Sequence, residues 1–181
     1  MATIIEWSNQ LVINHQIIDE QHQEMIAMIN RLHDCIVEPG QRAEFADQLE
    51  QLCNYTMDHF ATEEALMTQA GIDARHLDGH RHAHADFVAQ VEAMRGASDA
   101  TQVVPALYTF VTSWLTFHIL DTDQSMARQL RAMEAGATAA EAYEAETGHS
   151  ADPGNAALIG AVRSLLDFLI ERFSAEPAWR P

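Results

Sequence analysis

The stretch HFATEEALMTQAGIDARHLDGHRHAHADF, residues 59–87, decides the fold of this chain. It holds an HxxxE pattern at 59–63 and an HxxxH pattern at 80–84. Residues four positions apart lie on one face of an α-helix, so each pattern presents two polar side chains in the same direction. Between the patterns, Gly71 marks the end of the first periodic segment. The stretch therefore predicts two helices joined by a short turn, which run antiparallel.

The same helical period continues on both sides of this stretch. Apolar side chains recur at steps of three and four residues over 18–36, 45–66, 77–94 and 107–118. The turn signal Pro39-Gly40 separates the first two of these segments. Four amphipathic helices joined by short turns predict an all-α fold, namely an up-down-up-down antiparallel four-helix bundle.

The composition changes after residue 134, which is where we expect the bundle, residues 1–134, to end. Residues 135–154, AGATAAEAYEAETGHSADPG, are rich in alanine, glutamate and glycine and are interpreted as a linker or a marginal helix. Residues 155–181 predict an additional C-terminal amphipathic helix and tail. A single amphipathic helix cannot bury its own apolar face. We therefore expect it to pack on the bundle, on a second copy of the chain in a homodimer, or on a signalling partner.

The charge balance and the cysteines limit the classes of function. The formal net charge of -17 leaves nothing to neutralise phosphates, which argues against nucleic acid and against an anionic membrane surface. The N-terminal residues lack the features of a signal peptide, and no apolar run is long enough to span a bilayer. Cys35 and Cys53 form no CxxC pair and are interpreted as small buried residues, with a disulfide or a regulatory thiol as the alternative. These features predict a soluble, cytoplasmic protein.

Polar residues interrupt the apolar faces at positions that the helical period assigns to the interior. They are His22, His59, Glu63, His80, His84 and His118. A buried carboxylate has to be paired or to bind a metal, because an isolated buried charge costs several kcal/mol. A backbone carbonyl can satisfy one buried histidine, but five histidines on converging faces of four helices indicate a metal site.

The donor types restrict the metal. Nitrogen and carboxylate oxygen donors without thiolates exclude cysteine-rich zinc and iron–sulfur sites. Imidazole suits iron, zinc, copper or nickel, and carboxylates that can bridge favour a pair of hard, redox-active ions. The ligands outnumber those of one tetrahedral ion, so two metals are expected. This chemistry favours two irons and leaves two manganese ions or zinc open.

Four motifs in this chain resemble those of the hemerythrin family in order and spacing. They are DEQH at 19–22, HFATE at 59–63, HRHAH at 80–84 and WLTFHILDTD at 114–123. Together they form the family pattern of a lone histidine followed by HxxxE, HxxxH and HxxxxD. The resemblance covers roughly residues 6 to 134 and implies the same four-helix fold.

The resemblance also implies a ligand set and a function. The implied metal ligands are His22, His59, Glu63, His80, His84, His118 and Asp123. Two iron ions, bridged by an oxo or hydroxo group, would be the cofactor. One iron would be held by His80, His84 and His118, and the other by His22 and His59 with a position open for dioxygen. The two carboxylates would each bridge both irons, and the protein would bind dioxygen reversibly for sensing, storage or delivery.

Asp123 is the one ligand that the helical period does not place. Five residues after His118, it lies about 140° around an ideal helix from that histidine. We therefore expect either a side chain that swings inward or a local widening of the helix near Leu120-Asp121.

The remaining histidines allow another register. A His76/His80 pair could replace His80/His84, but the latter places Phe87 where the family has a phenylalanine. His82 lies off the apolar face and is expected to face solvent. Three further histidines are also expected at the surface, namely His15, His33 and His149.

Two other functions compete with oxygen binding. The first is a di-iron enzyme acting on peroxide, nitric oxide or ferrous iron, which we do not expect because nothing in the sequence places a general acid or a substrate pocket beside the metals. The second is a structural bundle whose histidines bind zinc for stability. Steady turnover would favour the first alternative, and stoichiometric zinc without iron would favour the second.

Overall fold

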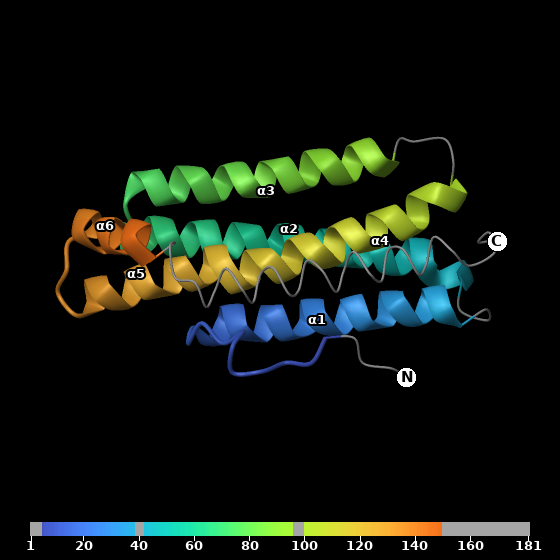
Figure 1. The fold of residues 1–181 in the computed structure, drawn as a ribbon, viewed down its shortest axis with the longest axis horizontal. Coiled ribbons are helices and arrows are strands. Elements are labelled where there is room, and N and C mark those ends of the chain that lie inside the picture. The colour runs from blue at the N-terminus through green and yellow to red at the C-terminus, as the bar shows by residue number, and fades with distance from the viewer. Residues whose placement is uncertain (1–4, 39–41, 96–99, 150–181) are drawn as a thin grey trace. The chain divides into compact units, whose positions relative to one another are not determined.

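The computed structural model describes residues 5–38, 42–95 and 100–149. All the regular elements in these residues are helices and none is a strand, so the predicted all-α fold class is confirmed. The chain divides into two compact units, with the boundary between Gly71 and Ile72. Each unit supplies one antiparallel pair of long helices, as predicted for the two halves of the bundle (Figure 1).

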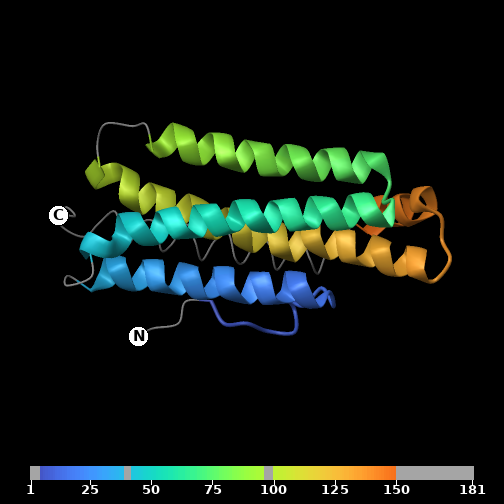
Figure 2. The same cartoon turned by 180° about the vertical axis from the view of Figure 1, so that it is seen from behind.

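The first unit is a helical hairpin of α1 (Gln16–Val37) and α2 (Phe45–Ala70), and the short 3-10 helix η1 (Arg42–Glu44) comes between them, directly before α2. The two long helices lie side by side and antiparallel in both views (Figures 1 and 2). The helix α2 ends at Gly71, whose φ of 69° is left-handed and whose N–H donates to Thr68 O and Met67 O. Glycine adopts this conformation without the steric cost of a Cβ atom, which explains the predicted turn.

The second unit contains α3 (Ala74–Arg95) and a long helix that returns antiparallel to it (Figure 1). This returning helix consists of α4 (Ala100–Phe117), the π-helical segment η2 (His118–Asp123) and α5 (Gln124–Glu134). The N-terminus of α3 is capped by Asp73, whose Oδ1 accepts from Arg75 N at 2.9 Å.

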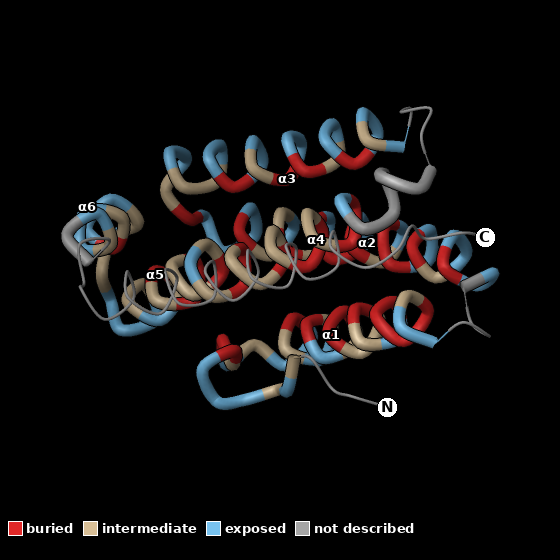
Figure 3. Tube along the Cα trace, turned by 45° about the vertical axis from the view of Figure 1, so that its right-hand side comes forward, coloured by how far each residue is buried: buried red, intermediate tan, exposed pale blue. Residues whose placement is uncertain are grey.

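One face of each long helix is buried, and the opposite face is exposed (Figure 3). The apolar residues that the helical period assigned to the interior include the fully buried Ile18, Met25, Leu32, Leu52 and Val111. Cys35 and Cys53 are both buried free thiols, as expected. Burial raises the pKa of Cys35 above its usual value, with the carboxylates of Glu44 and Asp34 adding to the shift. Both thiols therefore belong to the interior.

Residues 139–149, within the stretch interpreted as a linker or a marginal helix, form the helix α6 (Ala139–His149). Thr138 and Glu141 form a capping box: Glu141 N donates to Thr138 Oγ1 at 3.2 Å, and Thr138 N donates to Glu141 Oε2 at 2.8 Å. The guanidinium of Arg128 binds the Glu146 carboxylate through Nε and one terminal nitrogen at 2.8 to 3.0 Å, which attaches α6 to α5. The TxxE pattern was the sequence signal for this helix.

One expectation was wrong. His33 is only 7 % exposed, whereas a surface position was expected. Burial lowers its pKa, and the neighbouring Asp34 opposes that shift. His82 faces solvent as expected, with its side chain 79 % exposed.

The predicted helix over 155–181 and the side chain of His149 lie outside the described residues. Within the described ranges, no helix is both long enough and apolar enough to cross a membrane.

Candidate metal centre

The first unit buries three of the predicted ligands in one cluster. His22 comes from α1, His59 and Glu63 come from α2, and all three are 0 % exposed. Glu63 Oε1 lies 3.4 Å from His59 Nε2 and 3.9 Å from His22 Nε2. The two imidazole rings meet edge to face, with centroids 4.8 Å apart. The spacing of four residues on a regular helix therefore directs an imidazole and a carboxylate to one point, as predicted.

Gln21 orients one of these imidazoles. His59 Nδ1 donates to Gln21 Oε1 at 3.1 Å, while Gln21 Nε2 donates to Thr62 Oγ1 at 3.1 Å. Thr62 Oγ1 in turn donates to Asp58 O at 2.8 Å. Because the Nδ1 proton is committed to Gln21, His59 Nε2 keeps its lone pair for a metal. The sequence did not name this partner, since the contact joins side chains of two different helices.

The second unit buries the other four predicted ligands. His80 and His84 come from α3, His118 and Asp123 come from η2, and none is more than 4 % exposed. His118 Nε2 lies 3.0 Å from His84 Nε2 and 3.1 Å from His80 Nε2. Asp123 Oδ1 lies 3.1 Å from His118 Nε2 and 3.4 Å from His80 Nε2. Three imidazole nitrogens and a carboxylate oxygen therefore point to one place.

The π-helical segment explains how Asp123 joins this cluster. In a π-helix the backbone bonds span five residues instead of four, so residues i and i+5 approach the same face. His118 and Asp123 are the first and last residues of η2. The predicted widening near Leu120-Asp121 is therefore confirmed, and Asp123 is fully buried.

The donor spacing in the second unit fits a transition metal. Two nitrogens bound at about 2.1 Å to one ion at right angles lie about 3.0 Å apart. The nitrogen pairs at 3.0 and 3.1 Å match this separation. A carboxylate beside three imidazoles is a donor set suited to iron, and it contains no thiolate.

Trp114 covers the outer side of the same cluster. Its ring stacks on that of His118, with centroids 4.4 Å apart and an interplanar angle of 15°. The Phe87 ring also packs on Trp114, tilted by 42° with centroids 4.5 Å apart. These aromatic contacts hold the His118 ring in place and shield it from water.

His76 lies beside the cluster without joining it. Gln129 Nε2 donates to its Nδ1 at 2.9 Å, and its ring meets that of His80 with centroids 5.5 Å apart. Burial, followed by the neighbouring His80, lowers the pKa of His76 to about 4. Among the described residues, His76 belongs to neither group of converging ligands. The structure therefore supports the His80/His84 register over His76/His80.

The antiparallel helix pairs and the two buried clusters define an α-helical protein whose buried imidazole and carboxylate side chains could hold metal ions. Comparison with known proteins agrees. Residues 14–130 match the model of the family described as hemerythrin HHE cation binding domain. The chain belongs to this hemerythrin family.

Similar proteins include bacterial and animal relatives. A bacteriohemerythrin of Stenotrophomonas maltophilia is 35% identical over 133 residues, which are 73% of this chain and 84% of the relative. A bacteriohemerythrin of Pseudomonas aeruginosa is 33% identical over 132 residues, 72% of this chain and 84% of the relative. A myohemerythrin of Riftia pachyptila is 27% identical over 117 residues, 65% of this chain and 86% of the relative.

Proposed function

We propose that this chain binds dioxygen reversibly at a non-haem di-iron centre, in the cytoplasm, for oxygen sensing, storage or delivery. The observation that carries the proposal is the burial of seven imidazole and carboxylate side chains in two clusters, one in each unit. Membership of the hemerythrin family supports it, as do the relatives named bacteriohemerythrin and myohemerythrin. The proposal assigns the centre to residues 1–134.

Each cluster has a distinct role in this proposal. His80, His84 and His118 would hold one iron, and His22 and His59 would hold the other. The carboxylates of Glu63 and Asp123 would complete the ligand set and balance the charge of the irons. The pair of irons, when bound, supplies reversible electron transfer to dioxygen.

The protein's own side chains orient the ligands and exclude water. Gln21 holds the His59 ring through Nδ1, and Trp114 stacks on His118. Apolar neighbours of the ligands in sequence, Met25, Ile26 and Ile119, are no more than 5 % exposed. A dry, apolar surrounding slows protonation and irreversible oxidation, which favours binding over consumption of oxygen.

Anaerobic reconstitution with ferrous iron tests the proposal. Iron is quantified per chain, and the visible absorbance spectrum is recorded while oxygen is added and then removed. Two irons per chain and a charge-transfer band that forms with oxygen and disappears under vacuum are expected. A band that never forms, or oxygen consumption that leaves a di-ferric spectrum, would contradict reversible binding and favour the di-iron enzyme.

A further inference from the structure

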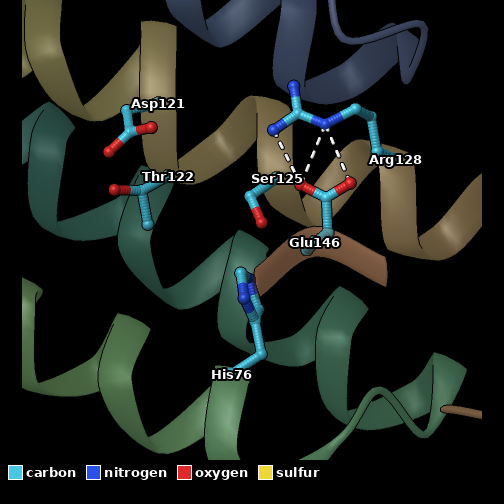
Figure 4. Close-up of a pocket in the computed structure, with 6 residues that line it drawn as sticks. All are labelled: His76, Asp121, Thr122, Ser125, Arg128 and Glu146. Atoms are coloured by element: carbon cyan, nitrogen blue, oxygen red, sulfur yellow. Dashed lines mark hydrogen bonds and ion pairs between the residues drawn. The ribbon is translucent and has the colours of Figure 1, made fainter. Parts of the chain in front are cut away.

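The second unit contains a polar pocket of about 220 Å³. It is lined by the six residues shown in Figure 4, namely His76, Asp121, Thr122, Ser125, Arg128 and Glu146. They come from α3, η2, α5 and α6, so α6 supplies part of the wall through Glu146. The family match ends at residue 130, before α6 begins. This part of the pocket wall thus lies beyond the region that matches the family.

The charge of the pocket is negative. Arg128 and Glu146 neutralise each other through three contacts of 2.8 to 3.0 Å. Asp121 is exposed and contributes a carboxylate, while Thr122 and Ser125 contribute hydroxyl groups. Oxygen donors and a net negative charge attract a cation and disfavour an anion.

The pocket lies against the ligand cluster of its own unit. His76 stands one helical turn before His80, and the two rings are in edge contact. Asp121 and Thr122 belong to the same π-helical segment as His118 and Asp123. His76 therefore forms the wall between the pocket and the ligands.

His76 also has an imidazole nitrogen to offer. Its Nδ1 accepts from Gln129, which puts the ring proton on Nε2, and Nε2 is buried with no hydrogen-bond partner among the described residues. To bind a cation through Nε2, the ring moves this proton to Nδ1, where the Gln129 amide turns its oxygen to accept it. Imidazole nitrogen is a common ligand of iron and other first-row transition metals. The four ligands behind this wall are at most 4 % exposed, so an ion from solvent has to pass through the protein to reach them.

We propose that this pocket is the access site through which divalent transition-metal cations reach the ligand cluster of the second unit. Asp121 attracts the ion at the surface, and His76 binds it transiently before it reaches His80. This inference rests on the proposed metal centre. It assigns the pocket to metal loading, whereas binding of dioxygen takes place at the loaded centre.

The rate of metal uptake by the metal-free full-length protein tests the inference. Co²⁺ serves as the probe, because its visible absorption reports nitrogen and oxygen ligation in stopped-flow measurements. Asp121→Asn removes the exposed charge, and His76→Phe removes the imidazole. Asp86→Asn and His82→Phe are matched controls, since both side chains are more than half exposed on α3 and pair with each other at 3.4 Å away from the pocket.

Uptake of Co²⁺ by the Asp121→Asn variant is expected to slow by about threefold to fivefold, the effect of one charge about 8 to 10 Å from a divalent ion in water. Added salt should slow the wild-type protein more than this variant. His76→Phe should slow uptake further, while both controls retain the wild-type rate. The final cobalt content should be equal in all five proteins.

Equal uptake rates in Asp121→Asn and the controls, with full loading, would overturn the access site and leave the metal centre standing. Asp121 is exposed, so its substitution tests the inference even if His76→Phe fails to fold. A wild-type protein that binds neither cobalt nor iron would instead overturn the proposed function, and the access site with it. Unchanged uptake with altered oxidation of the iron-loaded protein would assign the pocket to water and also overturn the inference.

Discussion

The two ligand clusters join an imidazole and a carboxylate in different ways. In the first unit, His59 and Glu63 stand four residues apart on a regular α-helix, and Glu63 Oε1 lies 3.4 Å from His59 Nε2. In the second unit, His118 and Asp123 stand five residues apart, yet Asp123 Oδ1 lies 3.1 Å from His118 Nε2. The π-helical turn of η2 makes up for the extra residue. The comparison teaches that a locally widened helix can match the donor geometry of a regular one.

Insertion of one alanine after Leu120 would test this comparison most severely. The insertion converts the spacing of His118 and Asp123 to six, which the π-helical turn no longer matches, and rotates α5 by about 100° relative to α4. The buried side chains of Met126 and Gln129 would then turn away from the interior. We expect a loss of about 3–5 kcal/mol in the free energy of unfolding, the range of large core substitutions, and loss of iron.

Chemical denaturation and iron quantification measure this effect. Insertion of one alanine after Ala137, in the connection between α5 and α6, is the control and should retain iron. A variant with the insertion after Leu120 that keeps wild-type stability and two irons would show that the spacing of His118 and Asp123 is not needed.

Neutralising the two carboxylates compares their contributions directly. Glu63→Gln and Asp123→Asn preserve size but remove the charge that balances a bound cation. Each should lower iron affinity by more than the roughly 10- to 100-fold that loss of an outer hydrogen-bond partner costs. Iron titration under anaerobic conditions measures the affinity. Because an uncharged amide is less costly to bury, neither variant should be less stable than wild type without metal. Unaltered affinity in either variant would remove that carboxylate from the ligand set.

Acid should destabilise the second unit through His76, a histidine that lies beside the predicted ligands. Gln21, the residue described beside the predicted ligands of the first unit, does not titrate. Its pKa falls from 6.5 to about 4 on folding, so the unfolded state binds the extra proton between these pH values. The contribution of His76 to the free energy of unfolding is therefore full above pH 6.5 and is lost as the pH falls toward 4. The shift corresponds to about 3 kcal/mol, which partial exposure reduces to about 2.

Unfolding curves of the metal-free protein at pH 7 and pH 4.5 measure this loss, with His76→Gln as the comparison. The variant should lose about 2 kcal/mol less than the wild type over this range. An equal loss in both proteins would exclude His76 as the source.

The smallest effect is expected at the partner of His59 in the first unit. Gln21→Ala removes the acceptor for His59 Nδ1 without altering a ligand. We expect iron affinity to fall by about tenfold, the lower end for loss of an outer partner. Gln23→Ala, on an exposed face of α1, is the control. Iron titration of both variants checks the prediction, and equal affinities would show that Gln21 does not orient the ring.

Much of the fold and of the candidate site was predictable because it depends on local periodicity. The His59/Glu63 and His80/His84 pairs follow from 3.6 residues per turn, and Gly71 marks a helix end through its backbone freedom. The burial of His33 was not predictable in this way. It follows the buried Ile29 by four residues, at the edge of the apolar face, where the helical period alone does not decide whether a polar side chain is buried.

The sequence by itself determined the helices, the turn at Gly71 and six of the seven candidate ligands, because residue type and spacing are local properties of a helical chain. Asp123 followed only from the resemblance to the hemerythrin family. Only the tertiary structure decided that the helix at Asp123 widens instead of the side chain swinging inward. Only the tertiary structure likewise paired Gln21 with His59 and formed the pocket of Asp121, His76 and Glu146. These contacts join residues that are distant in the sequence or depend on backbone distortion, and a linear pattern specifies neither.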